Sequence, residues 1–271
     1  MVHHEYGSII GISAAVADAE YFGRLASTYG DGAYYGIRRR AVLGSIAKEF
    51  AHARSVLDLG CGNGAYLAEF ADAPGIRQLF GADLTAEMLR EARRRTSSKV
   101  SLVCADAWRL PFRKRAFDFI FASHVLPFVA DLYGAVAEIA RCLVPGGLLV
   151  ATRQDGDSTI RRAMSGIIGK ARWNDFARLV MRTAPRDNAS TAPDDRYRRA
   201  FTSATLDVEE RVVPFQITWE DVEEWIGIRW LPLIPEDDRQ RARRMLAEVA
   251  RDARGATFPL HEPLMLGRKP R

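Results

Sequence analysis

The stretch Val56-Leu-Asp-Leu-Gly-Cys-Gly-Asn-Gly64 decides the fold of this 271-residue chain. The apolar run over 55–59 predicts a buried strand, and the three glycines at alternate positions predict a tight turn where the backbone approaches a ligand closely. Residues 65–72 then predict a short helix. A strand, a glycine turn and a helix N-terminus in this order are typical of a nucleotide-binding site.

Strands and helices alternate downstream of this turn. Because strands that alternate with helices form right-handed crossovers, the pattern predicts a parallel sheet. Thr85 is the expected N-cap of the second helix, and Val144-Pro-Gly-Gly147 is an expected turn. The further strands are expected over 77–82, 100–104, 117–122 and 148–152, and the helices over 86–95 and 131–143.

Two carboxylates follow the next two expected strands. Asp83 ends the second strand, where a carboxylate can accept hydrogen bonds from both ribose hydroxyls of a nucleoside. Asp106 follows the third strand and can accept one from an adenine amino group, with Leu84 and Trp108 as apolar faces. Since the carboxyl ends of parallel strands share one edge of the sheet, we expect these groups beside the glycine turn.

Five stretches in this order resemble the class I S-adenosylmethionine-dependent methyltransferases, in their small-molecule, ubiquinone/menaquinone-methyltransferase-like branch. Five ordered motifs are far more specific than one glycine signature. The resemblance implies S-adenosyl-L-methionine as cofactor. It also implies an α/β fold with a Rossmann-like, doubly wound, mostly parallel seven-stranded sheet, an antiparallel last strand and a helical cap. The stretches are Val56–Gly64, Gly81–Leu89, Ala105–Phe112, Phe117–Ile120 and Leu143–Gly147.

The same resemblance implies roles for single residues. Asp83 is expected at the ribose, Asp106 and Ala107 at the adenine, and Tyr29 in a lid over the cofactor. The positions around the methionine part are Asp58, Gly60, Gly62 and Gly64, and the other expected cofactor contacts are Cys61, Leu84, Trp108 and Ser123.

His124, just past the fourth expected strand, is the candidate catalytic residue. Methyl transfer from a sulfonium is an in-line displacement with a neutral leaving group, so it needs a base only if the acceptor must lose a proton. The alternative is that His124 forms a pocket wall or is a satisfied core histidine. No His/Cys cluster has metal-ligand spacing, so we expect no metal.

The resemblance and the patterning together divide the chain into four segments. We expect an N-terminal helical lid over 1–53, an S-adenosylmethionine-binding core over 54–153 and a helical cap insertion over 154–205. The strands of 206–271 then complete the sheet, with a helical insertion at 219–253.

Substrate choice is expected to lie in the cap, where aromatic and aliphatic residues are abundant. Together they suggest an apolar or aromatic acceptor, although each taken singly fits the cap's own core better. Arginines could instead pair with an anionic substrate group, or belong to solvated helix faces. The apolar residues are Trp173, Phe176, Trp219, Trp225, Trp230, Leu231, Leu233 and Ile234, and the arginines are Arg38–Arg40, Arg153, Arg161 and Arg162.

Composition leaves an alternative function open. The net charge of +5 and the arginine clusters permit an RNA-directed methyltransferase, but solvated helix faces explain them better, so we expect a small-molecule substrate and no nucleic acid. A non-methylating member of the fold is a third alternative. A dinucleotide oxidoreductase is disfavoured, because its fingerprint is G-x-G-x-x-G and the spacing here is G-x-G-x-G.

The three cysteines form no C-x-x-C pair and favour a reducing compartment, hence a cytoplasmic protein. No apolar run approaches the length of a membrane span. The sequence leaves the oligomeric state open, with a homodimer as one alternative.

Overall fold

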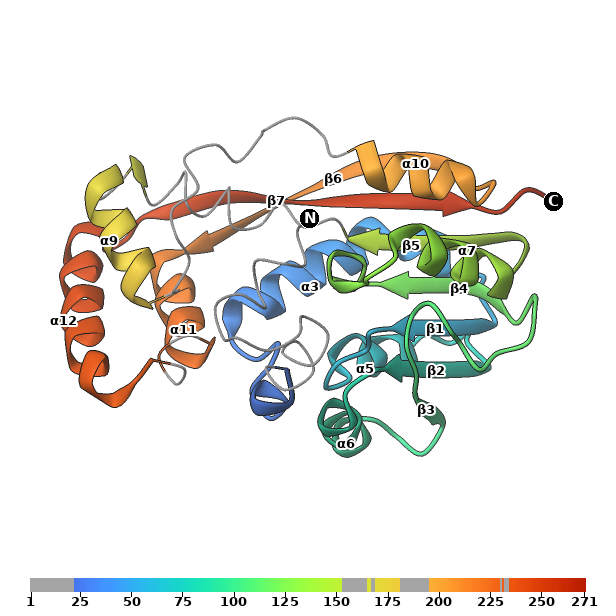
Figure 1. The fold of residues 1–271 in the computed structure, drawn as a ribbon, viewed down its shortest axis with the longest axis horizontal. Coiled ribbons are helices and arrows are strands. Elements are labelled where there is room, and N and C mark those ends of the chain that lie inside the picture. Colours follow the sequence, from blue (N-terminus) through green and yellow to red (C-terminus); the bar gives the residue numbers. More distant parts are fainter. Residues whose placement is uncertain (1–21, 153–164, 167–168, 181–194, 230, 232–233) are drawn as a thin grey trace.

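A computed structural model describes residues 22–152, 165–166, 169–180, 195–229, 231 and 234–271. Within these ranges the chain forms one seven-stranded sheet in the order β3-β2-β1-β4-β5-β7-β6 (Figure 1). The pairs from β3 through β5 are parallel, and β7 runs antiparallel to both of its neighbours. This confirms the expected α/β fold, with its mostly parallel sheet and its antiparallel last strand.

The strands are β1 (Ser55–Leu59), β2 (Gln78–Asp83), β3 (Val100–Cys104), β4 (Phe117–Ala122), β5 (Leu143–Thr152), β6 (Asp207–Thr218) and β7 (Thr257–Arg268). The helices are α3 (Ala33–Ser45), α4 (Ala47–Phe50), α5 (Ala65–Ala71), α6 (Ala86–Arg95), the short 3-10 helix η1 (Leu126–Phe128), α7 (Leu132–Cys142), α9 (Lys170–Val180), α10 (Asp195–Ser203), α11 (Trp219–Arg229) and α12 (Glu236–Ala253).

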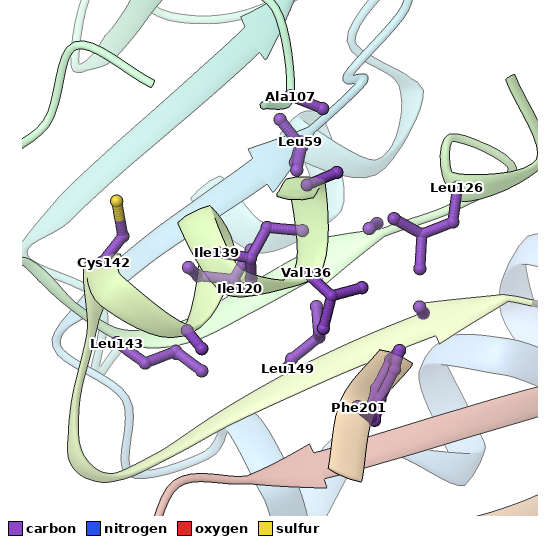
Figure 2. Close-up of a cluster of buried hydrophobic side chains, with 14 of the residues drawn as sticks. Leu59, Ala107, Ile120, Leu126, Val136, Ile139, Cys142, Leu143, Leu149 and Phe201 are labelled. Carbon is purple, nitrogen blue, oxygen red and sulfur yellow. The ribbon is translucent and has the colours of Figure 1, made fainter. Parts of the chain in front are cut away.

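The central strands β1 and β4 are apolar apart from one aspartate in each and the serine that begins β1, because both faces of the sheet are covered. Ile120 and Leu149 belong to the core cluster that α7 and α10 cover, and Figure 2 shows Val136 and Ile139 of α7 above these two side chains. The alternate residue Phe121 packs into the cluster on the opposite face, with α3 and α5. A strand buried on both faces reads as a continuous hydrophobic run rather than as an alternating one.

The last two strands form a ribbon that is longer than the sheet it completes. β6 and β7 pair over all twelve residues, whereas β5 pairs only with Leu264–Arg268 of β7. The remaining half of the ribbon projects past the sheet and carries α9, α11 and α12 at its far end (Figure 1). A separate apolar cluster holds these elements together and includes Trp173, Trp219 and Trp225. This cluster forms the cap.

The structure differs from the expected elements at several points. Val144–Gly147 does not precede β5 as a turn but lies inside it, at a register shift opposite β4. Thr85 occupies the N-cap position of α6, but its side chain makes no capping hydrogen bond. Helix α10 is not expected from the sequence as a separate element, and Phe201 on it packs with α7 rather than with the cap. The stretch 184–195, whose polar residues and two prolines predict a loop, lies almost wholly outside the described residues.

Candidate cofactor site

The glycine turn between β1 and α5 has the geometry that only glycine adopts without strain. Gly60, Gly62 and Gly64 have φ values of +65°, +53° and +85°. The amide of Gly60 donates to the carbonyl of Ala82 at 2.7 Å, which ties the turn to the end of β2. A side chain at Gly60 would overlap Val125, so the segment after β4 lies directly against the turn.

Asp83 connects the end of β2 to the same turn. Its Oδ2 accepts a hydrogen bond of 2.8 Å from the amide of Gly62, and its Oδ1 accepts one of 2.9 Å from the amide of Thr85. Burial raises the pKa of the Asp83 carboxyl even though these amide donors oppose the shift. The expected ribose acceptor is therefore held at the carboxyl edge of the sheet, beside the glycines.

Asp58 is the most unusual group of the site. Its side chain is buried on β1, and Oδ2 has no hydrogen-bond partner among the described residues. Burial, together with the nearby charge of Asp83, raises the pKa of Asp58 well above its ordinary value. A buried carboxylate without a partner costs free energy, so its presence indicates a cationic or hydrogen-donating ligand group. The ammonium group of S-adenosylmethionine meets that requirement.

We expect Asp58→Asn to stabilise the protein without ligand at pH 8. A group whose pKa is raised on folding contributes stability below its unfolded pKa and loses that contribution as the pH rises through its folded pKa. Removing the charge abolishes this loss and adds about 1–3 kcal/mol at pH 8. Urea unfolding at pH 5 and at pH 8 measures the effect, and affinity for S-adenosylmethionine should fall in the same variant.

Asp118→Asn is the matched control, with the opposite sign. Burial opposes the shift, but amide donors of Ser55 and Arg54 lower the pKa of Asp118, with Oδ2 at 2.8 Å and 2.9 Å from them. The stability that Asp118 contributes is present at pH 8 and is lost as the pH falls. This variant should therefore be less stable than the parent at pH 8. If Asp58→Asn were destabilised at pH 8 as much as Asp118→Asn, the raised pKa assigned to Asp58 would be contradicted.

The expected adenine side of the site is open. Leu84 is 50% exposed and Trp108 is 57% exposed, an uncommon state for large apolar side chains. Asp106 stands in the turn after β3, where its Oδ1 accepts a weak hydrogen bond of 3.4 Å from the amide of Trp108. Ala107 and Cys61, two further expected contacts, are buried.

The segment after β4 brings Ser123 and His124 to the same edge. His124 has a φ of +56°, and its amide donates to Oγ1 of Thr152 at 2.7 Å. Its ring nitrogen Nε2 lies 3.1 Å from Oε1 of Glu262 on β7. Glu262 in turn accepts a hydrogen bond of 2.5 Å from Nε of Arg38 on α3. No sequence pattern points to Glu262, and Arg38 lies in an inner ion pair rather than in a substrate pocket.

A row of aromatic rings runs from this site to the cap, and the sequence does not signal its contacts. All of its members are half-buried except Trp225, which is buried. The ring centroids of Phe128 and Phe22 are 5.3 Å apart, those of Phe22 and Tyr29 are 5.6 Å apart, and the row continues to Tyr35 at 6.0 Å. Tyr34 and Trp225 complete it on the cap side. Tyr29, expected as a lid over the cofactor, lies against Gly62 of the glycine turn. We call these six residues the aromatic row.

Several arginines of the sequence clusters are paired within the chain. Arg94 pairs with Glu91, and Arg95 with Asp31 at 2.8 Å. Arg198 pairs with Glu210 at 2.7 Å. Arg153, Arg161 and Arg162 lie outside the described residues. These pairs fit solvated helix faces better than a nucleic-acid surface.

The described ranges lack two kinds of feature that would suggest other functions. No group of three or more His, Cys, Asp or Glu side chains there is arranged to hold a metal ion. No helix in those ranges has the length and apolar character to cross a membrane.

Comparison with known proteins relates part of the chain to methyltransferases. Residues 57–151 match the family model described as a methyltransferase domain. Malonyl-[acyl-carrier protein] O-methyltransferase of Legionella pneumophila is 34% identical over 127 residues, which are 45% of this chain and 45% of that protein. Trans-aconitate 2-methyltransferase of an Acidovorax species is 35% identical over 125 residues, 45% of this chain and 47% of that protein. The matched region thus spans about half the length of these curated relatives.

A solved structure extends the likeness to most of the fold. The YcgJ protein from Bacillus subtilis superposes with a TM-score of 0.55 at 22% identity, covering 84% of this chain and 98% of that one. The glycine turn, the strand order and the matched domain agree with one another. Residues 57–151 therefore match a methyltransferase domain, and the strand order of the surrounding sheet agrees with that match.

Proposed function

We propose that this protein transfers a methyl group from S-adenosylmethionine to a small, fairly apolar metabolite. The observation that carries the proposal is the glycine turn with two carboxyl groups of raised pKa, Asp58 and Asp83, at the carboxyl edge of β1 and β2. Asp83 would accept the ribose hydroxyls, and Asp58 would receive the ammonium group of the methionine part. Leu84 and Trp108 would flank the adenine, with Asp106 at its amino group.

The cofactor supplies an activated methyl group on a sulfonium. The chain itself then has mainly to position the reactants, because it must hold the acceptor in line with that methyl group and exclude water. Tyr29 would cover the glycine turn, where its ring lies against Gly62. His124 would stand on the acceptor side at the end of β4, with Ser123 beside it as a cofactor contact.

The aromatic row supports an apolar or aromatic acceptor. The large cap residues Trp173, Phe176 and Trp219 are buried in the cap's own core, so they do not define a substrate pocket. The rings of Phe22, Tyr29 and Phe128 are instead half-buried, and Tyr29 lies against Gly62 of the glycine turn. Flat apolar rings stack on such faces at centroid distances like those within the row.

The remaining alternatives are less well supported. An RNA-directed enzyme needs a continuous basic surface, whereas Arg94, Arg95 and Arg198 are paired with acids of the same chain.

We also propose a cytoplasmic location, because Cys61, Cys104 and Cys142 are free thiols and two of them are buried.

Transfer of a labelled methyl group tests the proposal. The purified protein is incubated with donor labelled at the methyl group, in parallel with the small-molecule fraction and the total RNA of a cell extract. We expect label in the organic phase of the first sample, with S-adenosylhomocysteine formed in equal amount. Label in RNA alone would support the RNA-directed alternative instead. Donor binding with no transfer to either fraction would indicate a non-methylating member of the fold.

A further inference from the structure

Three charged or titratable groups from distant parts of the chain meet where the β6–β7 ribbon leaves the sheet. The carboxylate of Glu262 contacts Nε2 of His124 at 3.1 Å through one oxygen and Nε of Arg38 at 2.5 Å through the other. The side chains of Glu262 and Arg38 are only 6% and 7% exposed, whereas that of His124 is 22% exposed. The carboxylate therefore lies between an inner arginine and an outer histidine.

The carboxylate of Glu262 is held ionised between Arg38 and His124. Burial alone would raise the pKa of Glu262, but the charge of Arg38 and the contact with His124 lower it to about 2. Burial would likewise lower the pKa of Arg38, and Glu262 reverses that shift. Tyr66 on α5, whose pKa burial raises, and Tyr34 on α3 are further titratable groups that interact with Arg38. Glu262 is thus a carboxylate at every physiological pH.

The backbone of His124 is held in a left-handed conformation at the end of β4. Left-handed backbone at a residue other than glycine costs free energy, and such residues gather at functional sites. The hydrogen bond from its amide to Thr152 holds the strained conformation. The next residue, Val125, lies against Gly60. The backbone of His124 is therefore held beside the glycine turn, and the contact with Glu262 orients its ring.

We propose that Glu262 is a positioning residue that presents His124 as a proton acceptor, and that the acceptor substrate carries its nucleophile as a hydroxyl group. This inference rests on the methyl transfer proposed above. A carboxylate on Nε2 holds the proton on that nitrogen, which leaves the lone pair on Nδ1. A base helps only an acceptor that must lose a proton, so a carboxylate acceptor would gain nothing from it. The aromatic row favours a phenolic or enolic hydroxyl.

Atoms and electrons balance in this transfer. The hydroxyl oxygen forms a bond to the methyl carbon while the bond from that carbon to sulfur breaks, and the electron pair of the broken bond stays on the sulfur as a neutral thioether. The hydroxyl proton moves to Nδ1 of His124, and the imidazolium is stabilised by Glu262. The proton then leaves to solvent.

The experiment uses the full chain, labelled methyl donor and two sets of acceptors, simple phenols and simple carboxylic acids. We expect transfer to phenols. Glu262→Gln should lower kcat for phenols by about 10- to 100-fold with little change in KM for the donor, the size of effect when an orienting partner is lost. His124→Asn should lower kcat by about 100- to 10,000-fold. The double variant should lose no more than His124→Asn alone, because Glu262 acts through His124.

Further variants separate positioning from support of the fold. Glu262→Gln leaves the Arg38 charge buried without a counter-ion and can unfold the protein, so Arg38→Met/Glu262→Gln removes both charges. This double variant should recover stability while kcat stays low. Glu209→Gln, on an exposed carboxylate of the same ribbon that pairs with Arg211, is the control and should leave kcat unchanged.

A measurement on the protein without acceptor tests the tautomer directly. Histidine nitrogen NMR, with the His124 signals identified by their loss in His124→Asn, should show neutral His124 protonated at Nε2. In Arg38→Met/Glu262→Gln this preference should weaken. Three kinds of result would overturn the inference. The first is protonation of Nδ1 in the parent, and the second is recovery of kcat together with stability in Arg38→Met/Glu262→Gln. The third is methyl transfer to carboxylic acids alone or to neither set of acceptors. Failure to bind the donor at all would instead refute the proposed function.

Discussion

Asp83→Ala should weaken binding of S-adenosylmethionine by about 100-fold or more. The carboxylate is assigned to both ribose hydroxyls, and each hydrogen bond to a charged group contributes about 1.5–3 kcal/mol. The substitution also removes the hydrogen bond of 2.8 Å that the carboxylate accepts from the amide of Gly62, so the glycine turn loses one of its ties to β2. Both losses act on the same binding site. Isothermal titration of the purified variant with the cofactor measures the result.

Asp72→Ala is the control for Asp83→Ala. Asp72 is an exposed carboxylate at the C-terminus of α5, the helix that follows the glycine turn. Its removal changes the net charge equally but should leave cofactor affinity within about twofold. An Asp83→Ala variant that keeps its fold and binds the cofactor like this control would show that the ribose is held elsewhere.

Gly60→Ala should destabilise the protein by about 2–5 kcal/mol and abolish cofactor binding. A φ of +65° costs a residue with a Cβ roughly 1–2 kcal/mol. The new methyl group would also overlap Cγ2 of Val125, and relieving that overlap costs about 1–3 kcal/mol more. The relief must move either the turn or the segment that carries His124. Urea unfolding and cofactor titration report the two effects separately.

Gly44→Ala is the matched substitution without these penalties. Gly44 lies inside α3, and a Cβ there would meet nothing within 4 Å. Because glycine inside a helix costs about 0.5–1 kcal/mol relative to alanine, this variant should be more stable than the parent. If Gly60→Ala were as harmless as Gly44→Ala, the turn would have neither the left-handed backbone nor the close contact with Val125.

Local patterns made the core of the fold predictable. The glycine spacing encodes the turn itself, and the apolar runs of β1 and β4 encode burial on both faces of the sheet. The bounds of α12, 236–253, could be predicted because its apolar residues recur at helical spacing. The register shift within β5 could not, because Pro145 and the two glycines after it read locally as a turn. Pairing with β4 overrides that local preference.

Only the site residues that stand at the end of a strand could be predicted from the sequence. Asp83 follows its strand directly, so its place at the sheet edge follows from topology. The contact between Arg38 and Glu262 joins residues 224 positions apart, and that between His124 and Glu262 joins residues 138 apart. No periodicity or spacing signals such a contact. The aromatic row likewise joins Phe22 to Phe128 and Tyr34 to Trp225, and each of these pairs lies far apart in the sequence.

Cofactor titration tests the central claim, that the glycine turn with Asp58 and Asp83 binds S-adenosylmethionine. The protein is titrated by calorimetry with S-adenosylmethionine, with S-adenosylhomocysteine and with NAD(H), and the first titration is repeated with Asp83→Ala. We expect saturable one-to-one binding of both sulfur compounds, no binding of NAD(H), and a loss of about 100-fold in the variant. Tight NAD(H) binding with no S-adenosylmethionine binding would contradict the claim.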